Sequence, residues 1–323
     1  MEAKKLIPIL VLTTCLSSLG ACTQNNQKVS FGGYWQANSL ITENLHEKLL
    51  YDVEYNDDNA AMYDYTINYT NGQYVTELQS ATENGKNILI YKTELTINVT
   101  YTHKGTTSEV FEDKVVTEAK FYTADNSLRP ISSFKELVST SPANNGSTLE
   151  SCYHKFHYEA SVTYNENCTG GTATVTENPD GETPTTKTAE FTFDKDKYSR
   201  LDNETLLFAI RAIPSTTNSA KIQTYSPFVE REQIVALSFS AETAAEFTYT
   251  ENGESKTRNI SYRPVNIVLD ENNPGATQKA WYAKVADTTK NTYRNVMLRL
   301  ETPISYGLGT LVYKLKSVDI LSK

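Results

Sequence analysis

Residue types that carry out chemistry are scarce in this sequence. Its 323 residues include four Cys, four His, three Met and two Trp. The strings G-x-S-x-G and H-E-x-x-H and the phosphate-binding P-loop are all absent. Because a catalytic triad can assemble from residues far apart in the sequence, these absences argue only weakly against an enzyme. They leave no catalytic residue and no cofactor to predict.

The histidines do not form a metal motif. His154 and His157 are three residues apart in a segment where apolar and polar residues alternate. Side chains three apart on a strand point to opposite faces of a sheet, so these two imidazoles would not share an ion. His46 and His103 lie far from them in the sequence. We therefore predict no metal ligands and expect all four histidines on a surface or a sheet face.

Long hydrophobic runs are missing as well. A transmembrane helix needs ~20 apolar residues, whereas the apolar stretch at residues 6–19 is interrupted by Pro8, Thr13 and Thr14. Lys4 and Lys5 precede this stretch, and small residues follow it. A basic start, a short apolar stretch and small residues are the layout of a secretory signal peptide. We predict one over residues 1–21.

The segment Leu19-Gly20-Ala21-Cys22 resembles the bacterial lipobox. The resemblance implies transfer of a diacylglyceryl group to the Cys22 thiol and cleavage between Ala21 and Cys22. Residues 22–44 would then be the lipidated cysteine and a flexible tether. Two acyl chains hold a protein firmly, so we expect an extracytoplasmic lipoprotein anchored to a membrane, at the cell surface or on the periplasmic face. The alternative is an ordinary signal peptide with a chance cysteine.

An excess of positive charge is also absent. Without residues 1–21, which carry Glu2, Lys4 and Lys5, the chain has 28 basic residues (30 − 2) and 38 acidic residues (39 − 1), a net charge of −10. An acidic surface repels the phosphate backbone of nucleic acids. We therefore expect no nucleic-acid partner.

Few cysteines remain for a disulfide. Cys15 lies in the predicted signal peptide and Cys22 would take the lipid, which leaves Cys152 and Cys168. The alternation over residues 156–164 predicts one unbroken strand between them. At ~3.3 Å per residue such a strand keeps its ends ~40 Å apart, while a disulfide needs Cα atoms within ~7 Å. The bridge forms only if the chain folds back between the two cysteines.

Strand-forming residues, by contrast, are abundant. The 21 Tyr and the many Thr favour pleated sheet, and apolar residues alternate with polar ones over residues 49–55 and 89–101. Asn-Gly pairs at 71–72, 84–85 and 252–253 predict turns between strands. We therefore predict an all-β, mainly antiparallel fold, either a strongly curved sheet or an open barrel or β-roll.

One segment has helical spacing instead. Asp202 is a good N-cap, the apolar residues at 206, 209, 210 and 213 share one face, and Pro214 ends the pattern. The sequence thus predicts one short helix near 203–213. It belongs to a single β domain over residues 45–323, in which the loop at 139–148 is the best candidate for a break between halves.

Several segments resemble the domain-of-unknown-function 3108 family of exported bacterial domains. Leu50-Tyr51-Asp52-Val53-Glu54-Tyr55 is similar to that family's opening strand, and residues 204–214 are similar to its single helix. Further similar segments lie at residues 122–134, 297–306 and 309–317. The resemblance implies a strongly curved antiparallel sheet around a helix. It implies no known activity, so no functional residue follows from it.

Three functions stay open from the sequence. The first is a non-enzymatic envelope lipoprotein that binds an apolar ligand or an envelope partner, and a cavity too large for side chains to fill would favour a ligand. The second is a fully packed structural or adhesion module. The third is a hydrolase of envelope polymers, which needs two suitably spaced carboxylates. Five tyrosines either line a ligand groove or pack the sheet: Tyr51, Tyr63, Tyr65, Tyr69 and Tyr91.

Overall fold

Strands provide most of the regular structure in the computed structural model. It describes residues 28–31, 46–57, 64–122, 127–143, 147–179, 182–193, 197–284, 295–304 and 307–320. The elements follow the chain as β1 (His46–Asn56), β2 (Tyr65–Glu83), β3 (Lys86–His103), β4 (Thr106–Thr107), β5 (Phe111–Tyr122), β6 (Arg129–Pro142), η2 (Leu149–Cys152), β7 (Tyr153–Tyr164), β8 (Gly170–Pro179), β9 (Thr185–Thr192), β10 (Ser199–Arg200), η3 (Asn203–Thr205), α1 (Leu206–Ile210), β11 (Ser219–Ser226), β12 (Arg231–Phe239), β13 (Thr243–Glu251), β14 (Glu254–Val268), β15 (Gln278–Ala283), β16 (Met297–Pro303) and β17 (Thr310–Ile320). The predicted all-β fold is confirmed. None of the helices in these ranges has the length and apolarity to cross a membrane.

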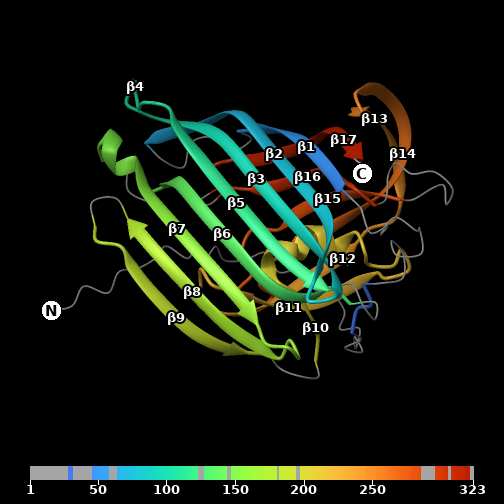
Figure 1. The fold of residues 1–323 in the computed structure, drawn as a ribbon. Helices are drawn as coiled ribbons and strands as arrows, with labels where there is room; N and C mark the ends of the chain where they lie inside the picture. The colour runs from blue at the N-terminus through green and yellow to red at the C-terminus, as the bar shows by residue number, and fades with distance from the viewer. Residues whose placement is uncertain are drawn as a thin grey trace, which may run out of the picture.

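The strands join into one strongly curved sheet (Figure 1). From one edge, antiparallel pairing connects β9, β8, β7, β6, β5, β3, β2, β1 and β17 in that order. The sheet continues from β17 through β16 and β15 to β14, whose partner β13 returns to β17 by a short parallel contact. Strands β13 to β17 therefore form a closed ring, and the wide sheet extends from it.

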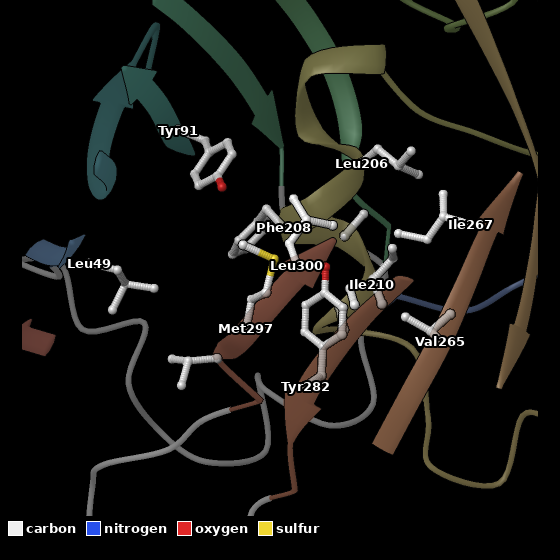
Figure 2. Close-up of a cluster of buried hydrophobic side chains, with 14 of the residues drawn as sticks. Leu49, Tyr91, Leu206, Phe208, Ile210, Val265, Ile267, Tyr282, Met297 and Leu300 are labelled. Carbon is white, nitrogen blue, oxygen red and sulfur yellow. The ribbon is translucent and has the colours of Figure 1, made fainter. Parts of the chain in front are cut away.

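The short helix α1 lies inside the curve of the sheet and supplies much of the core (Figure 1). The Phe208 ring lies 5.4 Å from the Tyr91 ring on β3 and 5.3 Å from the Phe121 ring on β5, measured between centroids. On its other side Phe208 faces Met297 (Figure 2). Full burial of such a side chain is worth about 2–3 kcal/mol. A five-residue helix is unstable alone, so this packing holds it in place.

A buried ion pair fixes the end of α1. Arg211 follows the helix directly, and its guanidinium donates to both carboxylate oxygens of Glu47 on β1, at 2.7 and 2.9 Å. Burial alone would lower the Arg211 pKa, but the charge and hydrogen bonds of Glu47 raise it above its ordinary value. Asn295 donates from its amide nitrogen to the Arg211 carbonyl at 2.9 Å. The end of the helix is thus held from two sides.

A buried carboxylate fixes the start of the helical segment. Asp202 accepts a hydrogen bond from the Glu204 backbone N–H at 2.8 Å, which confirms the predicted N-cap. Its other oxygen accepts from the Ser133 hydroxyl at 2.6 Å and the Tyr164 hydroxyl at 2.7 Å. Burial, reinforced by the charge of Glu204, raises the Asp202 pKa to about 6 although these hydrogen bonds lower it. The cap thereby links the helix to β6 and β7.

The predicted helix near 203–213 is present but shorter. Helical structure ends at Ile210, and residues 211–213 continue as turns. Pro214 lacks the N–H that would bond to the Ile210 carbonyl, and it disfavours helical angles at the residue before it.

The turn predicted at Asn71-Gly72 is wrong. β2 runs through this pair, and the register with β3 slips by one residue between Thr70 and Gln73, which is a β-bulge. Asn71 has a φ of 54°, and a Cβ on Gly72 would lie 2.6 Å from the Val53 carbonyl oxygen. Asn-Gly fits a bulge for the same reason that it fits a turn, since both need a positive φ. The pairs at 84–85 and 252–253 do form turns between paired strands.

The sheet continues into the segment expected to separate two halves. β6 extends to Pro142, which pairs with Tyr153 at the start of β7. Within the predicted tether at 22–44, residues 28–31 lie against the domain, where Phe31 is buried and the Val29 carbonyl accepts from the Ser199 hydroxyl at 2.9 Å. The rest of that segment and the signal peptide lie outside the described residues.

Candidate functional site

The inside of the curved sheet is filled by side chains. Tyr51, Tyr65 and Tyr91 are each at most 5% exposed and belong to core clusters. A cavity beside α1, next to Arg211 and Tyr282, measures only about 40 Å³, whereas small-molecule sites span about 300–1,000 Å³. These tyrosines therefore pack the sheet and do not line a ligand groove. Tyr63 lies outside the described residues.

A larger groove lies where β5 and β7 begin and β6 and β8 end. Its volume is about 510 Å³, and it is lined by residues 109–112, 138–140, 155–157, 178 and 179. Antiparallel pairing brings these four strand ends together, because each strand reverses the direction of the one before it. The groove is thus built by the sheet itself.

A buried carboxylate forms hydrogen bonds with two residues that line the groove. Asp113 is 8% exposed and accepts from the Ser139 hydroxyl at 2.8 Å and the Thr140 backbone N–H at 2.8 Å. Burial raises the Asp113 pKa, and the hydrogen bonds from Thr140 and Ser139 oppose that rise. The Tyr101 hydroxyl donates to the Thr140 carbonyl at 3.1 Å. This network ties β5 to the end of β6 and fixes the backbone there.

Apolar and charged side chains alternate along the rim. Val110 is 63% exposed and Val138 is 42% exposed, which is high for side chains of this type. The Lys155 ammonium lies 4.5 Å from the centre of the Phe111 ring and 3.4 Å from a carboxylate oxygen of Glu109. The groove therefore offers apolar surface beside both signs of charge, which suits an amphipathic ligand.

A second hollow of about 330 Å³ separates β8 and β9 from the turn between β11 and β12. The Lys187–Glu230 ion pair, at 2.9 Å, spans it. Nearby, Tyr158 is 2% exposed and packs its ring 5.3 Å from that of Phe228 in this turn. Within the described ranges its hydroxyl has no hydrogen-bond partner. The turn therefore covers the sheet only in part.

The predicted site residues fall in different places. His157 lies at the groove and His154 is exposed on the other face, as the strand pattern predicted. The bridge considered between Cys152 and Cys168 is absent, since both are free thiols and the unbroken strand β7 separates them. Ala21 and Cys22 lie outside the described residues.

The two thiols are poor nucleophiles. Each donates to a backbone carbonyl at 3.2 Å, Cys152 to Thr148 and Cys168 to Pro130. Burial raises the Cys168 pKa to about 11, and burial followed by the charge of Glu150 also raises the Cys152 pKa. Only the thiolate reacts readily, so both side chains act as small core residues.

Sequence reasoning missed the Asp113 network, although a signal was available. Asp113 alternates with Phe111 and Val115, so the strand pattern places a carboxylate among residues of the buried face. A buried carboxylate needs hydrogen-bond donors. The donors Ser139 and Thr140 come from the neighbouring strand, and nothing in the spacing reveals them.

Comparisons with known proteins add little beyond the architecture. No family model and no curated protein matches this chain, so the resemblance to the 3108 family finds no support there and stays a prediction. Among solved structures, this chain is similar to one with a TM-score of 0.45 at 8% identity, over 86% of this chain and 98% of that chain. It is described as a β-barrel-like protein of domain of unknown function DUF1849 from Brucella abortus.

Proposed function

We propose that this protein is an exported lipoprotein that binds a small amphipathic ligand in the groove at the ends of β5 to β8. The observation that carries the proposal is the contrast in volume between the groove, about 510 Å³, and the cavity beside α1, about 40 Å³. A groove of that size fits a small molecule. Its apolar rim would take the body of the ligand, and Lys155 or the nearby carboxylates would take its polar end.

The membrane anchor rests on the sequence alone. Leu19-Gly20-Ala21-Cys22 supplies the thiol and the small residues that lipidation needs. Metabolic labelling with a fatty acid that carries an alkyne tests it directly. We expect label on the wild-type chain and none on Cys22→Ser, with Ser17→Ala in the signal segment as the control that keeps the label. Equal label on Cys22→Ser would contradict the anchor.

Ligand binding is tested on the mature chain, residues 23–323, exported from a bacterial host and studied by native mass spectrometry before and after organic extraction. We expect a discrete extra mass that extraction removes. Val138→Glu should abolish it, because a charge on the rim disfavours an apolar body. Leu269→Glu is the matched control, since Leu269 is 39% exposed, similar to Val138, and lies outside the groove.

The second candidate is a packed module that presents a surface to another envelope protein. The filled interior around Phe208 favours it. If every preparation shows only the mass of the chain without ligand, and Val138→Glu does not differ from wild type, the ligand proposal is wrong and the packed module is favoured. For hydrolysis of envelope polymers, Asp113 is an unsuitable carboxylate, since it is buried and hydrogen-bonded to Ser139 and Thr140.

A further inference from the structure

Three potential metal ligands meet on β6 and β7. The His157 Nε2 atom lies 3.1 Å from a carboxylate oxygen of Glu136 and 3.4 Å from one of Glu159. The ligand atoms of all three side chains lie within 4.8 Å of one another. They point away from the helix, because Lys135, which alternates with Glu136, bonds to Glu204 beside α1.

The opposed carboxylates of Glu136 and Glu159 favour a bound cation. Glu136 and Glu159 are direct partners across the two strands, and like charges in that position destabilise a sheet. On the neighbouring strands the outward carboxylates instead face lysines, as in the Lys92–Glu118 pair at 2.8 Å. Across the described ranges, no Lys or Arg forms an ion pair with Glu136 or Glu159. His157 lies close to both carboxylates.

The spacing matches a coordination shell. Around a tetrahedral Zn²⁺, bonds of about 2.0–2.1 Å place neighbouring ligand atoms about 3.3–3.4 Å apart. The distances from His157 Nε2 to Glu136 and Glu159, 3.1 and 3.4 Å, are close to two edges of such a tetrahedron. One imidazole with two carboxylates is a donor set that divalent transition ions accept.

We propose that Glu136, His157 and Glu159 bind one divalent transition-metal ion, with Zn²⁺ as the probe. The ion would neutralise the opposed glutamates and leave a fourth position open. His157 also lines the groove, so the ion would lie close to the groove. The site is independent of whether the groove holds a ligand, because its three side chains are complete without one.

The sequence conceals this site. His154 and His157 are three residues apart and suggested a pair of ligands, but strand geometry places them on opposite faces. The proposed ligands are instead His157, Glu159 on the same strand, and Glu136 on the adjacent strand. Alternate residues of a strand share a face, so His157-x-Glu159 is the local part of the signal. The remaining ligand becomes visible only once the β6–β7 register is known.

Isothermal titration of the chelator-treated mature chain with Zn²⁺ tests the proposal. We expect one ion per chain, with binding at least about a hundredfold weaker in His157→Ala, since even outer-shell changes cost 10- to 100-fold. Glu136→Gln keeps the shape of the side chain and should weaken binding similarly. The matched control His154→Ala, an exposed histidine of the same strand, should bind as wild type does.

A second measurement separates a built site from general attraction of ions to an acidic surface. Co²⁺ in a tetrahedral N/O site gives a much stronger visible absorption band than octahedral aqueous Co²⁺. We expect this band in wild type and in His154→Ala, and its loss in His157→Ala. No bound ion in wild type, or equal binding by His157→Ala, overturns the proposal and leaves His157 as a hydrogen-bond partner of Glu136. Glu136 does not line the groove, so Glu136→Gln should keep the extractable mass of wild type whichever result is obtained.

Discussion

The sheet is packed in different ways in two regions of the molecule, around α1 and in the wing formed by β6 to β9. Around α1 the sheet curves onto a helix, and residues such as Phe208 and Ile267 are at most 1% exposed. In the wing the edge strand β9 is mostly exposed, and paired threonine hydroxyls, such as Thr174 with Thr188 at 3.1 Å, link it to β8. The groove, the second hollow and the Glu136–His157–Glu159 cluster all lie on or beside the wing. Packing around the helix thus supplies stability, and the wing supplies the accessible surface.

The largest loss of stability should come from removing one partner of the buried ion pair at the end of α1. Arg211→Ala should lower the free energy of unfolding by about 3–5 kcal/mol, because it leaves the Glu47 carboxylate buried without a partner. Urea denaturation measures the loss. The double variant Glu47→Leu/Arg211→Met, which removes both charges, should recover much of it. A loss below about 1 kcal/mol in Arg211→Ala would show that water reaches Glu47.

The start of the helix should make stability depend on pH. The Asp202 pKa is raised to about 6 in the folded chain, so the folded state holds this proton more tightly than the unfolded state does. Its contribution is present below about pH 4 and is lost as the pH rises through about 6, a total of about 3 kcal/mol. Asp202→Asn should remove this part of the pH dependence in denaturation between pH 4 and 7. Identical profiles for the two chains would mean that Asp202 titrates normally.

The smallest effect should come from the ion pair of the wing. The side chains of Lys187 and Glu230 are 62% and 48% exposed, and exposed pairs contribute about 0–1 kcal/mol. Lys187→Ala should therefore change the free energy of unfolding by less than about 1 kcal/mol, and added salt should reduce even that difference. A loss as large as that in Arg211→Ala would erase the distinction between the two regions.

The sequence predicted the all-β fold through the local alternation of apolar and polar residues. Alternation identified long strands such as β3, because a sheet that is buried on one face imposes a period of two. The N-cap at Asp202 was predictable for a similar reason. That this carboxylate would be buried against Ser133 and Tyr164 was not, since neither residue is near it in the chain.

The register between strands that are distant in the sequence decided features that local sequence patterns left open. Asn84-Gly85 forms a turn and Asn71-Gly72 forms a bulge, although each Asn has a φ near 50°. The difference is set by β3, which pairs with β2 before and after the bulge, and by β1, whose pairing with β2 reaches Gly72. The Glu136–Glu159 partnership follows the same logic, because only strand pairing brings two residues 23 positions apart face to face.

The closure of the ring by β17 has a consequence for how the chain matures. β17 bonds to β1, β16 and β13, and its Lys316 pairs with Asp52, 264 positions earlier. Contacts this distant form slowly, because a long loop must close before they contribute. During synthesis, β1 therefore has one edge unpaired until residues 310–320 emerge. Early strands in that state are targets for chaperones and proteases, so the rate of delivery of the final strand would limit the yield of native protein.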